Sequence, residues 1–200
     1  MSINRLRVIA GPNGSGKSTL FSLLRSQVKV GVWVNADELL NHITFQKTLD
    51  YNKIGFTPTQ KDFNTFKKKE SSIHFISEFT IEKEINSIVF GRFTITFGSP
   101  KFSNQSALFL SDFFRFYLIK NKISFTTETV FSHPSKLSLL QQANRAGFKT
   151  YLYFVATEKA EINIGRIGGR VFKGGHDVSS QKIRERFPRS IAMLNEAIPV

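Results

Sequence analysis

The chain has 200 residues, 40% of them hydrophobic, which fits one domain with a sizeable core that its 21 phenylalanine rings are expected to fill in large part. Lys and Arg outnumber Asp and Glu by 28 to 15, so the net charge of +13 favours phosphate-bearing ligands without naming one. The absence of cysteine excludes disulfides, thiolate metal sites and cysteine nucleophiles, and a cytoplasmic location is expected. No run of about 20 apolar residues occurs, so no membrane span is expected.

The chain opens with an alternation of strands and helices. Residues 5–10 form a short apolar run that predicts a strand, and residues 17–28 carry leucines and a phenylalanine at helical spacing. Residues 30–34 predict a second strand, followed by the charged turn Asn-Ala-Asp-Glu and a helix over 38–42. The charged turn is therefore expected at the carboxyl end of a strand.

The middle of the chain has a poor pattern. Gly55 and Pro58 interrupt it, and residues 85–97 have a strand-like composition. We interpret this stretch as an insertion with its own short elements. The expected organisation is a single domain over residues 1–200 with an insertion at about 44–105.

The second half returns to alternation. Periodicity predicts a helix over 106–120 and a strand over 123–127. A helix over 134–146, with proline in its first turn and a stop at Gly147, is followed by a buried strand over 149–156 that is apolar on both faces. The last predicted elements are a helix over 161–171 and a basic helix over 180–196.

Such alternation favours an α/β fold, a three-layer α/β/α arrangement with a mostly parallel sheet. Ligands of such folds bind beyond the carboxyl ends of the strands. Asp37, Glu128 and the glycine-rich stretch after the first strand all fall at those ends.

The glycine-rich stretch GPNGSGKST matches the phosphate-binding P-loop pattern G-x-x-x-x-G-K-[ST]. Glycines let backbone N–H groups face the phosphates, Lys17 neutralises the β and γ groups, and Ser18 is the expected Mg²⁺ ligand. The pattern predicts binding of ATP or GTP. The nucleotide-binding residues are expected to be Gly11, Pro12, Asn13, Gly14, Ser15, Gly16, Lys17, Ser18 and Thr19.

The residues that accompany this motif favour a kinase over a motor ATPase or a GTPase. The motor pattern, apolar residues followed directly by Asp-Glu, is met only loosely, and the GTPase pattern N-K-x-D is absent where expected. A kinase needs a carboxylate that accepts the proton of the acceptor hydroxyl, and Asp37 is the candidate. From spacing alone, an N-cap role for Asp37 at the next helix is an equal alternative. Glu128 either contacts the acceptor or supports Mg²⁺, or is a chance acidic residue at a strand end.

Cations for the transferred phosphoryl group are abundant near the end of the chain. Arg166 and Arg170 are four residues apart, which places both on one helical face. We interpret the predicted helix over 161–171, which carries both arginines, as a catalytic lid over the transferred group. The further basic residues, of which Arg186 and Arg189 fit a solvated helix better, are Lys173, Arg184, Arg186 and Arg189.

With these motifs, and with VNADE, FTTETVFSHPSKL, YLYFVATEKAEINIGRI and RVFKGGHDVSSQKI, the chain resembles the zeta toxin family of P-loop kinases, in the branch of ABC-type ATPases. Zeta toxins are cytoplasmic kinases that phosphorylate the sugar of UDP-N-acetylglucosamine and are blocked by an antitoxin. The resemblance implies Asp37 as the base, Glu128 and Thr129 as substrate contacts, and Arg166 or Arg170 as the first lid arginine. It also implies an antitoxin as a partner; nucleic acid is not expected as one.

Two departures from the family leave alternatives open. The second lid arginine has no clear counterpart, because His176 stands near its place and the next arginine is Arg184. Three glycines, Gly165, Gly168 and Gly169, lie beside the lid arginines and predict a looser lid. A kinase of another acceptor (a nucleoside, a cofactor or a nucleic-acid end) and an ATP-binding regulatory module without turnover are therefore alternatives.

Overall fold

The computed structural model describes residues 3–172 and 177–198, and the chain divides into two compact units. The first unit comprises Met1–Gly31 and Ser124–Val200, and the second comprises Val32–Ile123. The second unit is thus wider than the insertion predicted at about 44–105, because it also contains the helices on either side of that stretch. The assignment of a single domain stays a prediction.

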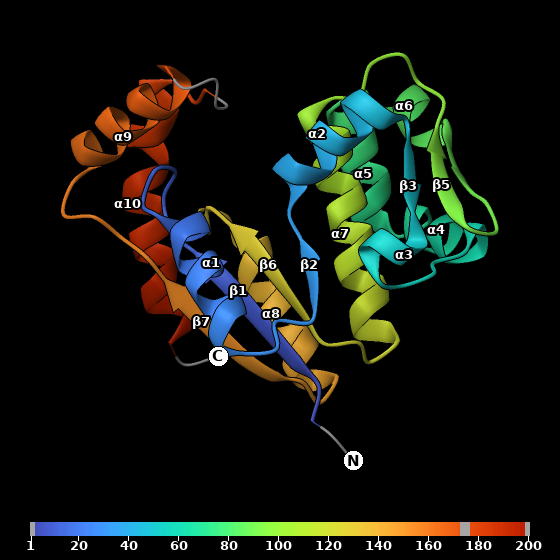
Figure 1. Ribbon diagram of the computed structural model, residues 1–200, viewed down its shortest axis with the longest axis horizontal. Coiled ribbons are helices and arrows are strands. Elements are labelled where there is room, and N and C mark those ends of the chain that lie inside the picture. The colour runs from blue at the N-terminus through green and yellow to red at the C-terminus, as the bar shows by residue number, and fades with distance from the viewer. Residues whose placement is uncertain (1–2, 173–176, 199–200) are drawn as a thin grey trace. The chain divides into compact units, whose positions relative to one another are not determined.

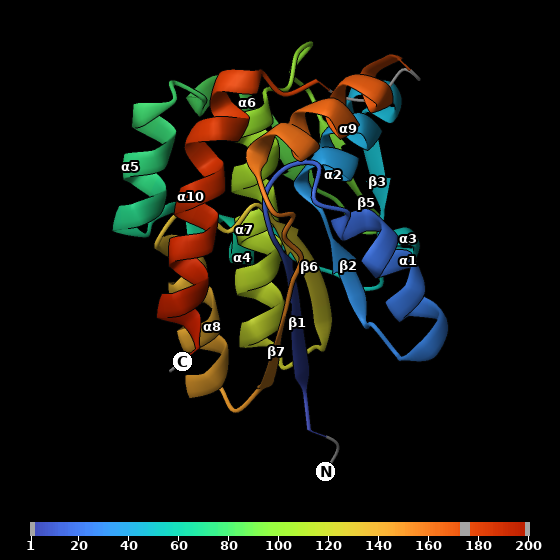
Figure 2. The same ribbon diagram turned by 90° about the vertical axis from the view of Figure 1, so that its left-hand side faces the viewer.

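The first unit is built on parallel strands that pair in the order β6-β1-β7 (Figure 1). Val8 in the central strand lies opposite Thr127 on one side and Leu152 on the other. Helix α1 lies on one side of these strands and α8 lies on the other (Figure 2). The elements of this unit are β1 (Arg5–Ala10), α1 (Lys17–Gln27), β6 (Phe125–Thr129), α8 (Ser135–Arg145), β7 (Lys149–Phe154), α9 (Ala160–Phe172) and α10 (Ser180–Ala197). The predicted α/β fold with a parallel sheet is confirmed.

Burial explains why these strands form, and it corrects one expectation. In β1 the five residues after Arg5 are all buried, as expected of a central strand. Residues 150–154 of β7 are only half-buried, so the prediction of a strand buried on both faces is wrong. Gly147 has a φ of 79°, a left-handed conformation that favours glycine, and it ends α8 as predicted.

The second unit combines an antiparallel sheet with helices. Its three sheet strands pair in the order β3-β5-β4, with Leu49 and Phe90 both opposite Ile95. The strand-like stretch 85–97 begins in a short helix and then forms two strands, so that prediction holds only in part. The elements of this unit are β2 (Val32–Val34), α2 (Ala36–Gln46), β3 (Thr48–Asp50), α3 (Tyr51–Ile54), α4 (Gln60–Lys67), α5 (Glu70–Glu78), α6 (Glu82–Asn86), β4 (Ile88–Phe90), β5 (Thr94–Phe97) and α7 (Asn104–Lys120).

Phenylalanine rings form the core of the second unit. Phe63 and Phe113 are fully buried, and their ring centroids lie 5.0 Å apart at an interplanar angle of 69°. Phe90 packs on both of them, at 4.9 and 5.4 Å. Phe109 and Phe66 extend the cluster at 5.2 Å from each other. The edge-on and tilted ring geometries are those that aromatic pairs prefer, so the many phenylalanines of the sequence are explained here by packing.

None of the helices within the described part of the chain is both long and apolar enough to cross a membrane.

Candidate functional site

The glycine-rich loop, residues 11–16, joins the end of β1 to the start of α1. Its turn is closed by the Ser15 N–H, which donates to the Pro12 carbonyl oxygen at 3.2 Å. Gly16 stands at the N-cap of α1 in a left-handed conformation with φ 108°, and no side chain caps this helix end. The first turn of α1 holds no acidic residue. The positive end of the helix dipole therefore keeps its capacity to bind an anion.

Three glycines of the loop are required for different reasons. A Cβ on Gly11 would lie 2.0 Å from the Val155 carbonyl oxygen, so the loop and the end of β7 could not pack with any larger residue there. A Cβ on Gly14 would lie 2.7 Å from the Asn163 carbonyl oxygen in α9. A Cβ on Gly16 would meet nothing within 4 Å. Gly11 and Gly14 thus serve close packing, whereas Gly16 serves the backbone conformation and borders open space.

Lys17 lies at the centre of this loop. It is 6% exposed, and its Nζ donates to the carbonyl oxygens of Gly11 and Pro12, at 3.0 Å in both cases. The same nitrogen lies 3.7 Å from Oε1 of Glu128 in β6. The predicted cation and one predicted carboxylate therefore meet at the loop, although they are 111 residues apart in the sequence.

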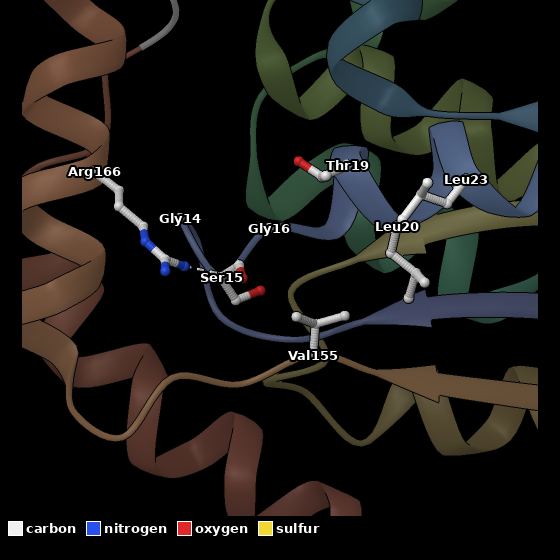
Figure 3. A pocket seen from close by; sticks show the side chains of 8 residues that line it. All are labelled: Gly14, Ser15, Gly16, Thr19, Leu20, Leu23, Val155 and Arg166. Carbon is white, nitrogen blue, oxygen red and sulfur yellow. Dashed lines mark hydrogen bonds between the residues drawn. The ribbon is translucent and has the colours of Figure 1, made fainter.

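An open pocket of about 520 Å³ lies against the loop (Figure 3). Its wall combines loop backbone with apolar side chains of α1, and its lining residues are Gly14, Ser15, Gly16, Thr19, Leu20, Leu23, Val155 and Arg166. The Arg166 side chain extends from α9 toward the loop, where Nη1 donates to the Ser15 carbonyl oxygen at 3.3 Å. The volume falls within the range of about 300–1,000 Å³ that is typical of small-molecule sites.

Buried polar atoms at this site lack hydrogen-bond partners among the described residues. They are Asn13 Oδ1, Ser15 Oγ and Asn163 Nδ2, and Asn163 is fully buried. Its Oδ1 accepts a hydrogen bond from the Thr157 hydroxyl at 2.6 Å, which fixes the orientation of the amide. Sequence reasoning missed Asn163, although an asparagine four residues before Ile167, on the buried side of α9, was a readable signal.

The other predicted site residues of the first unit lie in β6, α1 and α9. Glu128 is 18% exposed at its side chain, and Thr129, the last residue of β6, accepts a hydrogen bond from the Phe131 N–H at 3.1 Å. Ser18 lies on the exposed side of the first turn of α1. Arg170 lies one turn beyond Arg166 in the same helix and is exposed.

Asp37 belongs to the second unit, near the start of α2. The N-cap of this helix is Asn35, whose Oδ1 accepts hydrogen bonds from the N–H groups of Asp37 at 2.8 Å and Glu38 at 3.2 Å. The N-cap alternative for Asp37 is therefore wrong. Its side chain is exposed and has no hydrogen-bond partner among the described residues, whereas Glu38 accepts from the Trp33 indole N–H at 2.9 Å.

The other predicted cations are more dispersed. Arg184 in α10 lies 3.4 Å from Glu161 in α9, and Arg189 bonds within its own helix. Lys173 and His176 lie outside the described residues. Ala could replace Gly165, Gly168 or Gly169 without a steric contact, so packing does not require these lid glycines.

Within residues 3–172 and 177–198, no group of three or more His, Asp or Glu side chains could hold a metal ion.

The chain matches no known protein-family profile. A curated but uncharacterised protein from Haemophilus influenzae is 31% identical over 71 residues, which are 36% of this chain and 51% of that protein. The match thus spans about half the length of this relative.

Two solved structures resemble the whole fold. A proposed kinase from Chloroflexus aurantiacus superposes with a TM-score of 0.53 at 13% identity, over 94% of this chain and 78% of that one. The Pnkp1/Rnl/Hen1 RNA repair complex superposes with a TM-score of 0.50 at 14% identity, over 98% of this chain and 47% of that chain. At such identities the likeness establishes the fold alone, a kinase-like α/β fold.

Proposed function

We propose that the chain is an ATP-dependent phosphotransferase of the P-loop class, in which the glycine-rich loop and the first turn of α1 hold the nucleotide phosphates. The observation that carries this proposal is the buried Lys17, whose Nζ is held by two loop carbonyl oxygens at 3.0 Å beneath an uncapped helix start. When a nucleotide binds, the Lys17 ammonium group can replace its hydrogen bonds to these carbonyl oxygens with hydrogen bonds to phosphate oxygens. The unpartnered Ser15 Oγ and the open space in front of Gly16 also fit a ligand at the loop.

The reaction requires one bond to form and one to break. The acceptor hydroxyl oxygen attacks the γ-phosphorus, the bond from that phosphorus to the bridging oxygen breaks, and ADP leaves with the electron pair. We assign the hydroxyl proton to the carboxylate of Asp37. We assign stabilisation of the transferred group to Lys17, with Arg166 and Arg170 as further cations. Mg²⁺ would neutralise charge on the β- and γ-phosphates, with Ser18 as its protein ligand.

The exposed Asp37 carboxylate fits the role of a base because it has no hydrogen-bond partner among the described residues. Asn35, and not Asp37, caps this helix. The acceptor that we propose, from the resemblance to zeta toxins, is a sugar hydroxyl of UDP-N-acetylglucosamine or a similar nucleotide sugar, with Glu128 and Thr129 as its contacts. An antitoxin that covers the nucleotide site and a cytoplasmic location belong to the same proposal.

A nucleic-acid end is the second candidate acceptor. The first unit holds sixteen Lys and Arg against six Asp and Glu, a net +10. The fold of the chain resembles that of a chain in an RNA repair complex. Such a charge favours a polyanionic acceptor. A panel of UDP-N-acetylglucosamine, nucleosides and RNA ends with labelled ATP separates the two acceptors.

The test of the proposed function compares three variants. Lys17→Ala should abolish the thermal stabilisation that ATP gives the wild type. Asp37→Asn should retain this stabilisation and lose about 10²–10⁴-fold in phosphoryl transfer, the usual contribution of a general base. Glu38→Gln, a neighbour whose carboxylate bonds the Trp33 indole, is the matched control and should keep its transfer rate within about threefold.

Full transfer by Asp37→Asn would refute the assignment of the base. Nucleotide binding without transfer to any acceptor would instead favour the regulatory module.

A further inference from the structure

One face of the parallel strands in the first unit gathers cations and tyrosines. The register of β1 and β7 places Arg5 opposite Lys149 and Arg7 opposite Tyr151. Because alternate residues of a strand point to the same face, these four residues and Tyr153 lie on one face. We call this set, Arg5, Arg7, Lys149, Tyr151 and Tyr153, the cation–tyrosine face.

The members of this face are in contact. The Arg7 guanidinium carbon lies 5.3 Å from the Tyr151 ring centroid, and Lys149 Nζ lies 5.6 Å from the same centroid. The rings of Tyr151 and Tyr153 are 6.4 Å apart and nearly parallel, at 15°. The Tyr151 phenol has a pKa below its usual value, mainly because Arg5 forms a hydrogen bond to the hydroxyl. The nearby Lys149 acts in the same direction. Three cations thus surround one half-buried aromatic ring.

The positive charge of this face is not balanced within the described chain. Arg7 is 7% exposed, and its Nε and Nη1 have no hydrogen-bond partner among the described residues. Neither Arg5, Arg7 nor Lys149 forms an ion pair with a described acidic side chain. Buried guanidinium nitrogens without hydrogen-bond partners are costly, and an anion at this face would relieve that cost. The net charge of +10 on this unit also favours the binding of an anion.

We propose that the cation–tyrosine face binds single-stranded nucleic acid. Such strands present phosphates for Arg5, Arg7 and Lys149, and unpaired bases that can stack on the two tyrosine rings. Stacking on aromatic side chains together with a cationic groove is the common mode of single-strand binding. An acidic protein surface would use the cations and leave the parallel rings without a role. Val155, two residues beyond Tyr153 at the end of β7, lines the pocket at the glycine-rich loop, so a bound strand runs along β7 toward that pocket.

The experiment measures the fluorescence anisotropy of labelled 15-nucleotide RNA and DNA single strands mixed with the full chain at several salt concentrations. Three phosphate contacts predict a slope of about −2 for log K against log salt, since each contact contributes about −0.7. Arg5→Glu/Lys149→Glu should weaken binding by about tenfold or more and flatten this slope. Tyr151→Leu should weaken binding by about tenfold with little change in slope.

The matched control, Lys159→Glu/Lys182→Glu, changes the net charge by the same amount at exposed positions of the same unit. It should bind within about twofold of wild type at about 0.15 M salt, where distant charges are screened. Equal losses in the two double variants, equal competition by polyglutamate, or no binding by the wild type at low salt would each overturn the proposal. Melting curves confirm that each variant is folded. The assay needs no ATP, so its outcome is independent of the proposed phosphotransferase activity.

Discussion

Asn163 is the residue that ties helix α9 to the glycine-rich loop. Its backbone packs on Gly14 so closely that no Cβ fits there, and its amide is held by the Thr157 hydroxyl at 2.6 Å. Arg166 stands three residues later and reaches the same loop. Because the amide is fully buried, its orientation depends on the single hydroxyl that fixes it. Thr157 and Asn163 therefore act as positioning residues for Arg166.

We expect Thr157→Val to destabilise the protein by about 1–3 kcal/mol, because it leaves a buried amide oxygen without a donor. Valine keeps the shape of threonine, so lost packing contributes little. Thr157→Ser retains the hydroxyl and is the matched variant, with an expected cost below about 1 kcal/mol. Urea unfolding measures both. Equal losses for the two variants would show that the hydrogen bond does not hold the amide in place.

At the scale of elements, local side chains fix where several helices begin. Asn35 caps α2, Asp50 caps α3, and Ser103 caps α7. Helix α4 begins with a capping box, in which the Thr59 hydroxyl accepts from the Asp62 N–H and the Asp62 carboxylate accepts from the Thr59 N–H. Sequence reasoning placed α1, α7 and α8 within two residues of their observed bounds, because each has strong periodicity or a proline or glycine stop. It left α3–α6 undefined, because these helices have only four to nine residues and too few turns for a period to appear.

The capping box predicts a pH dependence of stability. Burial alone would raise the pKa of Asp62, but hydrogen bonds from Thr59 and the nearby Lys120 outweigh it and hold this pKa below its ordinary value of 3.8. A carboxylate whose folded-state pKa is lowered stabilises the fold above its unfolded-state pKa, and this contribution is lost as the pH falls below about 3.8.

Asp62→Asn should therefore cost about 0.5–2 kcal/mol at pH 7, and the difference from wild type should shrink below the ordinary pKa of the carboxyl. Urea unfolding at pH 7 and pH 3 measures this change. Glu82→Gln, an exposed acid in the first turn of α6, is the control and should lose less than about 0.5 kcal/mol. A loss that stays constant between the two pH values would contradict the role of the Asp62 charge.

At the scale of the whole molecule, the two units differ in charge and in core. The second unit has a core of phenylalanine rings and a net charge of +3, from twelve Lys and Arg against nine Asp and Glu. The first unit carries a net +10 and holds the glycine-rich loop. Like charges on one compact body repel each other, and this repulsion is screened by salt. Stability should therefore depend on the ionic medium.

We expect the melting temperature to rise when NaCl is increased from about 20 to about 200 mM, because the Debye length falls below about 10 Å. At equal ionic strength, phosphate should stabilise the wild type further, by about 2.7 kcal/mol at one hundred times its dissociation constant. This additional effect should be clearly smaller in Lys17→Ala and unchanged in Lys182→Ala. Differential scanning calorimetry measures both effects. An identical response of the two variants to phosphate would show that the loop is not the anion site.

The sequence by itself determined the strand, loop and helix that run from Arg5 to Gln27, and the parallel α/β class of the fold. These features depend on apolar periodicity and on the spacing of glycines, which are local patterns within a few residues of the sequence. The roles of Lys17 and Asp37 in phosphoryl transfer are likewise predictions of that kind, and they await the experiments above.

Only the tertiary structure decided which distant residues meet. It brought Glu128 to Lys17, Asn163 to Gly14, and Lys149 and Tyr151 to the arginines of β1. It also gave the capping of α2 to Asn35 instead of Asp37. The physical reason is that strand register and helix packing join residues more than a hundred positions apart. A one-residue shift of β7 against β1 would turn Lys149 and Tyr151 to the opposite face.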